Sequence, residues 1–250
     1  MATPPAAGTK PAALIIGAGD DLGGAIARAF AADGYTACLV RRPRNLDRLQ
    51  ALAAGITALG HEARAYGIDA RDEAAVVSLF DEIERDVGPV HVAVFNAGAN
   101  VRFPITEMTA QVYRKVWEMA CFAGFLMGRE AAKRMLPRGA GTILFTGATA
   151  SLRGGAGFSA FAGAKHALRA LAQSLARELG PKNIHVAHIV IDGAIDSNFI
   201  RENMPGVDEL RAKDGILSPE AIAANYVWLH RQPKNAWTHE LDLRPWTEKF

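Results

Sequence analysis

Residues 12–33 read AALIIGAGDDLGGAIARAFAAD. The run from Ala12 to Ile16 is short and wholly apolar, which is typical of a strand buried on both faces of a parallel sheet. A glycine-rich turn and a helical pattern follow it. Glycines let the backbone approach a phosphate closely, and the helix start offers unpaired N–H groups and a positive dipole end. The stretch predicts a strand–turn–helix unit that binds a pyrophosphate; on this segment alone, a tight turn without a ligand is the alternative.

A second predicted strand, over residues 36–40, ends in Arg41 and Arg42. In a nucleotide-binding unit this position faces the ribose of adenosine. An acidic residue there would bind the ribose 2′-hydroxyl, whereas arginines accept a 2′-phosphate through charge-assisted hydrogen bonds. The two arginines therefore favour NADP(H) over NAD(H), and a solvated basic loop is the alternative.

Strands and helices are expected to alternate along the rest of the chain. We predict helices over 44–59 and 72–87 and a long helical region over 109–136, with strands over 63–68, 90–95 and 142–146. A helix from about 157, a strand over 184–191, a helix that begins at a Ser218 cap and a strand near 239–243 complete the order. This repetition predicts an α/β fold with a single doubly wound, Rossmann-type parallel sheet and helices on both faces. A chain of 250 residues fits one domain, which we place at 12–250 after a flexible tail over 1–11.

Composition argues against several classes of partner. The 28 basic and 26 acidic residues give a net charge of +2, which offers no electrostatic reason for a nucleic-acid or membrane-surface role. No apolar run approaches the roughly 18 residues of a membrane span. Cys38 and Cys121 stand alone, without metal-ligand spacing, so we expect neither a disulfide framework nor a metal site. This cysteine usage fits a reducing cytoplasm.

Ligands of doubly wound sheets lie in the crevice outside the carboxyl ends of the strands. A residue that could serve such a site follows six predicted strands in turn: Gly17, Arg41, Asp69, Asn96, Gly147 and Asp192. We expect one crevice to collect them all.

The order of these motifs resembles that of the short-chain dehydrogenase/reductase family over about residues 12–243. The resemblance is carried by the turn at 17–23, Asp69, the run Asn96-Ala97-Gly98, Lys165 on its predicted helix, and Gly193 with Ser197. It implies a nicotinamide cofactor, a small-molecule substrate and assembly into homo-dimers or homo-tetramers. The implied cofactor site comprises Gly17, Gly19, Asp20, Leu22, Gly23, Arg41, Arg42, Asp69, Ala70, Asn96, Ala97, Gly98, Lys165, Gly193 and Ile195.

The resemblance also exposes departures from the family. Its members support hydride transfer with a Tyr four residues before the Lys, a Ser thirteen residues before the Tyr, and an Asn; here these positions hold Phe161, Ala148 and Cys121. Only Lys165 remains. Phenylalanine has no proton to exchange, and general acid–base assistance is worth about 10²–10⁴-fold, so ordinary carbonyl reduction is expected to be poor. Asp21 replaces a glycine and would repel a pyrophosphate unless it points outward.

Three functions stay open. The first is an oxidoreductase with relocated chemistry, which reduces C=N or activated C=C bonds. The second is a non-catalytic cofactor-binding sensor or an inactive partner subunit, and the third is a lyase or isomerase, which the retained nucleotide-binding residues disfavour. For the first, Lys165 and the strand-end carboxylate of Asp192 are the catalytic candidates. Further candidate proton donors are Thr149, Ser151, Ser159 and Cys121.

Aromatic residues point to a small, apolar substrate. The expected substrate pocket contains Phe103, Ala148, Thr149, Phe158, Phe161 and Phe199, with segment 194–217 as an apolar lid. Trp228, Trp237 and Trp246 are expected to pack in the interior, with a subunit contact or a pocket lid as the alternative.

Overall fold

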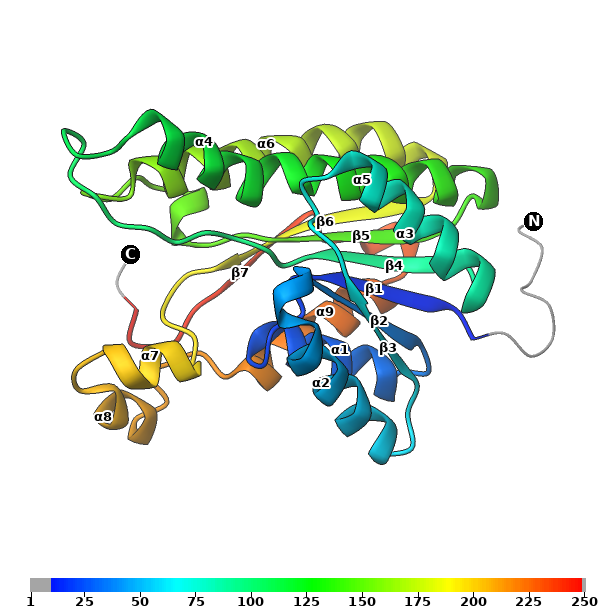
Figure 1. The fold of residues 1–250 in the computed structure, drawn as a ribbon, viewed down its shortest axis with the longest axis horizontal. Coiled ribbons are helices and arrows are strands. Elements are labelled where there is room, and N and C mark those ends of the chain that lie inside the picture. The colour runs from blue at the N-terminus through cyan, green and yellow to red at the C-terminus, as the bar shows by residue number, and fades with distance from the viewer. Residues whose placement is uncertain (1–9, 249–250) are drawn as a thin grey trace.

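The computed structural model describes residues 10–248, so the tail predicted over 1–11 lies outside the described residues except for Lys10 and Pro11. All seven strands are parallel and form one sheet in the order β3-β2-β1-β4-β5-β6-β7 (Figure 1). The strands are β1 (Ala12–Ile16), β2 (Thr36–Arg41), β3 (Ala63–Gly67), β4 (Val90–Phe95), β5 (Gly141–Thr146), β6 (Ile184–Ile191) and β7 (Glu240–Leu243). The order reverses between β1 and β4, which is the switch point where such sheets bind ligands. The predicted doubly wound α/β fold is confirmed.

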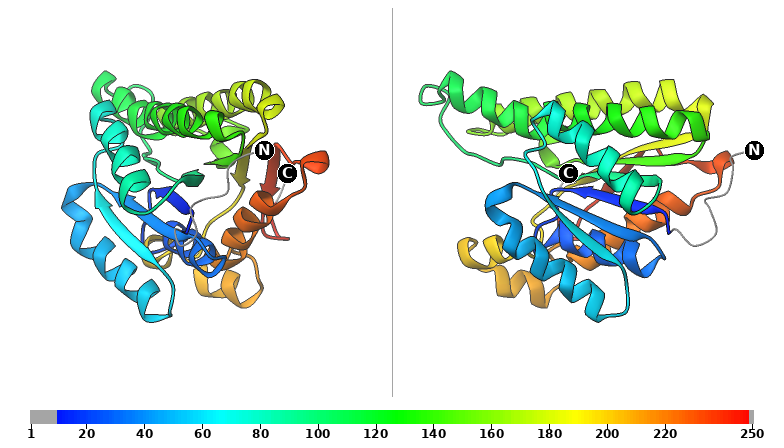
Figure 2. Two further views of the ribbon diagram at one scale, coloured as in Figure 1. Left: turned by 90° about the vertical axis from the view of Figure 1, so that its right-hand side faces the viewer. Right: turned by 45° about the vertical axis from the view of Figure 1, so that its right-hand side comes forward.

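Helices cover both faces of the sheet (Figure 2). One face carries α1 (Leu22–Ala32), α2 (Leu46–Ala58) and α9 (Pro219–Arg231); the other carries α3 (Glu73–Asp86), α5 (Ala123–Met135) and α6 (Ser159–Leu179). Helix α4 (Ala110–Trp117) packs beside α6, and the short helices α7 (Asn198–Asn203) and α8 (Val207–Ala212) lie at the edge of the molecule. In the described part of the chain, no helix is long and apolar enough to cross a membrane.

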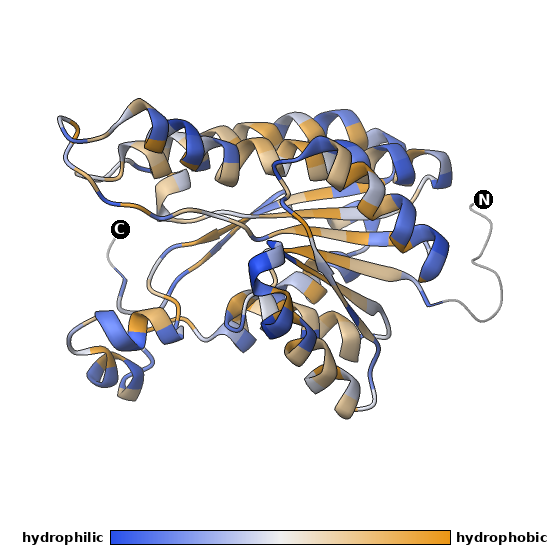
Figure 3. Cartoon of the chain, in the orientation of Figure 1, coloured by the Kyte–Doolittle hydropathy of each residue, from blue (hydrophilic) through white to orange (hydrophobic). Residues whose placement is uncertain are grey.

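Each face of the sheet has its own apolar core. Successive side chains of a strand point to opposite faces, so Leu14 of β1 joins the core under α3, α5 and α6, whereas Ile15 joins the core under α1, α2 and α9. Both cores must be apolar, which is why inner strands such as β1 and β4 are largely continuous hydrophobic runs (Figure 3). The rigid sheet fixes the positions of the strand ends, and with them the site.

The long helical region predicted over 109–136 is present as a continuous run from Ala110 to Met135, in which a π-helical turn, η2 (Glu118–Phe122), lies between α4 and α5. One prediction needs correction. The interior packing expected for the tryptophans is wrong for Trp228 and Trp246, which are exposed, the latter by 78%. Trp228 falls between the buried positions of α9, and Trp246 follows β7 beyond the sheet. Trp237 is half-buried and stacks on His185, with the ring centres 4.8 Å apart.

Candidate active site

Two adjoining cavities open at the carboxyl ends of the strands. The larger, of about 760 Å³, is lined by the turn after β1, by the ends of β4, β5 and β6, and by α6. Its lining includes Gly19, Asp20, Leu22, Gly23, Arg41, Asn96, Ala97, Gly98, Gly147, Ala148, Lys165, Gly193 and Ile195. The smaller, of about 210 Å³, is lined by Gly17, Arg41, Arg42, Asp69, Ala70, Asn96, Ala97 and Gly98 among others. The strand-end residues predicted to share a crevice therefore do so, apart from Asp192.

The glycine-rich turn is packed tightly against the end of β4. Gly17 has a φ of 92°, and a Cβ added there would lie 2.7 Å from the carbonyl carbon of Asn96. The Asn96 Nδ2 donates a hydrogen bond to the Gly17 carbonyl oxygen at 3.1 Å. No side chain fits at Gly17, and the start of α1 is left facing the larger cavity.

Positive charge gathers at the end of β2. Arg41 lines both cavities, and its Nη1 lies 3.8 Å from the Asp20 carboxylate. Burial lowers the pKa of Arg42, and the like charges of Arg44 and Arg71 lower it further. This rim therefore offers guanidinium groups whose mutual repulsion a bound anion would relieve.

Asp21 contacts the segment expected as a lid. Its Oδ1 accepts a hydrogen bond at 3.1 Å from the backbone N–H of Asn198, the first residue of α7. The carboxylate is thus turned toward α7, although Asp21 still lines the larger cavity.

Phe161 and Lys165 stand one turn apart on α6, and both line the larger cavity. Lys165 is only 4% exposed, and its Nζ donates a hydrogen bond to the Thr146 carbonyl oxygen at 2.8 Å. Burial lowers the pKa of Lys165 to about 8, and the nearby Cys121 opposes this shift. Ala148 lines the same cavity, so its floor presents a ring and a methyl group beside a buried amine.

Of the four further proton-donor candidates, only Thr149 lines the cavity. Its hydroxyl is engaged, because Oγ1 donates to Asp192 Oδ1 at 2.7 Å. Ser151 is fully buried, and its Oγ accepts a hydrogen bond from the Ala148 N–H. Burial raises the pKa of the Cys121 thiol, which makes it a weaker acid.

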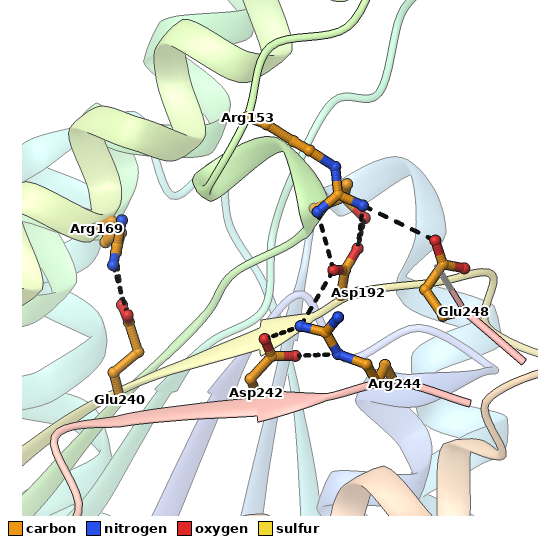
Figure 4. A network of polar contacts seen from close by, with 8 residues as sticks. Arg153, Arg169, Asp192, Glu240, Asp242, Arg244 and Glu248 are labelled. Carbon is orange, nitrogen blue, oxygen red and sulfur yellow. Dashed lines mark hydrogen bonds and ion pairs between the residues drawn. The ribbon is translucent and has the colours of Figure 1, made fainter. Parts of the chain in front are cut away.

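Asp192 lies behind the cavity wall in an ion-pair network (Figure 4). It is fully buried, with its carboxylate 3.2 Å from Arg153 and 3.5 Å from Arg244. Burial alone would raise the pKa of Asp192, but the hydrogen bonds from Thr149 and Arg153 outweigh it and hold the pKa below its usual range. An ionised and fully partnered carboxylate is a poor proton donor.

The structure brings Arg153, which the sequence did not single out, to the cavity, and it leaves two of the predicted pocket aromatics outside. Arg153 lines the larger cavity, and the only sequence signal for it is a basic residue directly before the Gly154-Gly155 pair. Phe158 and Phe161 line the cavity as expected, whereas Phe103 and Phe199 do not. Phe199 is 68% exposed on α7, a helix of 6 residues none of which is buried.

Comparisons with known proteins agree with this geometry. The family model described as short chain dehydrogenase matches residues 11–206. The short-chain dehydrogenase/reductase eriH of Hericium erinaceus is 31% identical over 222 residues, which cover 86% of this chain and 88% of that protein.

Solved structures give the same result. A short-chain dehydrogenase from Rhodopseudomonas palustris superimposes with a TM-score of 0.81 at 49% identity and covers 94% of this chain and 99% of its own. A 7α-hydroxysteroid dehydrogenase complexed with NADH and 7-oxo glycochenodeoxycholic acid reaches a TM-score of 0.84 at 26% identity, with 94% and 92% coverage. With a family match over most of its length and a nucleotide-binding crevice at the expected strand ends, this chain belongs to the short-chain dehydrogenase/reductase family of oxidoreductases.

Proposed function

We propose that this protein is an NADP(H)-dependent oxidoreductase with an atypical active site, which reduces C=N or activated C=C bonds of a small, largely apolar substrate. The observation that carries the proposal is the cavity floor. Phe161 and Ala148 stand there in place of the family's two hydroxyls, directly beside the buried Lys165.

The residues present fit a nicotinamide dinucleotide. The turn at Gly17 has no room for a side chain and leads into the start of α1, which suits a pyrophosphate. Arg41 Nη1 is buried, and within the described residues it has no hydrogen-bond partner; a 2′-phosphate would supply one. The 7α-hydroxysteroid dehydrogenase holds NADH, so the family alone does not choose the cofactor. The arginines support NADP(H).

When bound, the cofactor supplies the hydride. The apolar ring of Phe161 and the methyl group of Ala148 keep water from the reacting carbon but cannot protonate a carbonyl oxygen. A C=N⁺ bond needs no such proton, and a conjugated C=C bond places its developing negative charge on a remote oxygen. The enolate left by hydride addition to the C=C bond then takes its proton from solvent, which completes the saturated product. The Lys165 ammonium, buried at the floor, can stabilise that charge or hold the ribose of the cofactor.

Asp192 acts in this proposal as a positioning residue for Thr149 and Arg153 rather than as an acid. We also propose that residues 12–250 form one domain, because one sheet runs from Ala12 to Leu243. A cytoplasmic location is supported by the free thiols of Cys38 and Cys121.

A homo-oligomer is supported by aromatic side chains along α4, η2 and α5. Trp117 stacks on Phe122 and Phe122 on Phe125, with ring centres 5.9 and 6.1 Å apart, and Trp117 and Phe125 are exposed. A second copy that covered this face would bury them.

The test has two stages. NADPH and NADH are first titrated by energy transfer from protein fluorescence, and the saturated protein is then assayed with 2-cyclohexenone, 2-methyl-1-pyrroline and cyclohexanone. The proposal expects tighter binding of NADPH and turnover of the enone or the imine in preference to the ketone. Absence of binding to either cofactor contradicts the oxidoreductase, whereas binding without turnover favours a cofactor-binding sensor or an inactive partner subunit.

A further inference from the structure

Arg153 stands at the substrate end of the larger cavity. It follows the short helix η4 (Thr149–Ser151) and lines the cavity together with Gly154, Gly155 and Phe158. Its side chain is 47% exposed, so solvent and ligands reach the guanidinium. The proposed hydride transfer assigns Arg153 no contact with the cofactor or with the reacting carbon.

The guanidinium is held in a fixed orientation from behind. Its Nη1 and Nη2 both lie 3.2 Å from the carboxylate of the fully buried Asp192. Arg244 contacts the same carboxylate and also pairs with Asp242 (Figure 4). The Thr149 hydroxyl donates a hydrogen bond to Asp192 as well. An arginine has five N–H groups, so two bonds to Asp192 leave others for a second anion.

A second carboxylate, that of Glu248, already lies near the Arg153 guanidinium. Glu248 Oε1 is 3.8 Å from Arg153 Nη2, which is within ion-pair range but longer than a hydrogen bond. Glu248 comes from the segment after β7 and is partly exposed. A partly exposed pair at this distance is weak, so a ligand carboxylate can replace Glu248.

Charge along the cavity is unevenly distributed. Asp20, Asp21 and Arg41 line its cofactor end. At the other end, the charged side chains among the described lining residues are Arg153 and Lys165, both basic. Lys165 lies beside Phe161, where the reaction is proposed to occur, whereas Arg153 lines the side wall of the cavity.

We propose that Arg153 selects substrates that carry a carboxylate, which binds its guanidinium in place of Glu248 while an apolar body lies against Phe158 and Phe161. The inference rests on the proposed function, because it names the substrate class of the same site. It commits to a carboxylate, because that is the group already paired with Arg153 in this structure. Arg153 is thus a specificity-determining residue that does not take part in hydride transfer.

Direct binding tests the inference without any turnover. Benzoate and the neutral, isosteric benzamide are titrated by calorimetry into the full-length protein, with and without saturating NADP⁺. Wild type should bind benzoate about tenfold more tightly than benzamide, and Arg153→Gln should reduce that preference to about twofold or less. Glu248→Gln should raise the affinity for benzoate about threefold and leave the affinity for benzamide unchanged, because it removes the carboxylate that competes for Arg153.

Arg177→Gln, an exposed change on α6 away from the cavity, is the matched control for loss of one positive charge and should leave both affinities unchanged. Should Arg153→Gln fold poorly because it leaves Asp192 short of a partner, Glu248→Gln still decides the matter. Equal affinity for benzoate and benzamide in wild type, or no effect of Glu248→Gln on benzoate, overturns the inference. If NADP⁺ and NADPH fail to bind while benzoate does, the proposed function falls and the carboxylate site stands.

Discussion

The Nζ of Lys165 lies 5.8 Å from the centre of the Phe161 ring, one helical turn away on α6. In the resembling family an aromatic hydroxyl at this place takes part in proton transfer. Here the ring brings no ionisable group, and Lys165 is held by the Thr146 carbonyl oxygen instead. The four-residue spacing of the family's aromatic residue and lysine is kept, and the aromatic residue is Phe161.

The double change Phe161→Tyr with Ala148→Ser should create ketone reductase activity. It returns a phenolic acid beside Lys165 and a hydroxyl across the cavity, and such assistance is worth about 10²–10⁴-fold in kcat/KM. Cyclohexanone reduction is measured for the double variant and for each single variant, which should gain less. A double variant that binds NADPH yet stays inactive would mean that the cavity has diverged in shape as well as in chemistry.

Lys165→Met should change how stability depends on pH. Burial lowers the pKa of Lys165 from 10.5 to about 8, so the unfolded chain binds more protons than the folded one between these values. Wild-type stability should therefore gain up to about 3 kcal/mol from this group as pH rises from 8 to 10.5. Urea unfolding at several pH values measures the slope. Lys182→Met, which changes an exposed lysine, should leave the slope of stability against pH as in wild type. The same slope in Lys165→Met as in wild type would show that the Lys165 amine is not desolvated.

Arg41→Ala combined with Arg42→Ala should lower the affinity for NADPH about 100-fold and the affinity for NADH about threefold or less, because only NADPH carries the 2′-phosphate. Fluorescence titration gives both affinities on one sample, so NADH is the internal control for folding. Raising the salt concentration should weaken NADPH in wild type more than in the variant. Equal losses for the two cofactors would place the arginines away from the 2′-position.

Asp21→Asn should raise the affinity for NADPH about threefold to tenfold, because it removes a negative charge from the start of α1. The asparagine oxygen can still accept the hydrogen bond from Asn198, so the contact with α7 is kept. Asp86→Asn, at the exposed end of α3, is the matched control and should have no effect. If Asp21→Asn leaves the affinity unchanged, the carboxylate is already too far from the pyrophosphate to repel it.

Much of the fold follows from local patterns. An apolar run and the polar or glycine residues that end it lie within a few residues of one another, and the strand predicted over 90–95 agrees with β4. The Ser218 cap predicted at the start of a helix is likewise present, at the start of α9. The cavity lining around Gly17, Arg41 and Asn96 follows because the carboxyl ends of parallel strands meet at one edge of the sheet.

Other features depend on contacts between distant segments. Asp192 was expected at the reacting centre, but Arg153 and Arg244 come from separate parts of the chain and enclose it behind the wall. The π-helical turn at Glu118–Phe122 has no local sequence signature. Trp246 is exposed because the segment after β7 packs through its indole N–H on the Lys213 carbonyl oxygen rather than through its ring.

Hydride transfer without a phenolic acid is tested most directly by a single turnover of the protein with 2-cyclohexenone or cyclohexanone as acceptor. The NADPH carries deuterium at C4, and each of its two C4 epimers is used in turn. Mass spectrometry should find deuterium in the saturated ketone formed from the enone and essentially none in cyclohexanol. Deuterated cyclohexanol formed as fast as the reduced enone would contradict the account, because carbonyl reduction would then proceed despite Phe161 and Ala148.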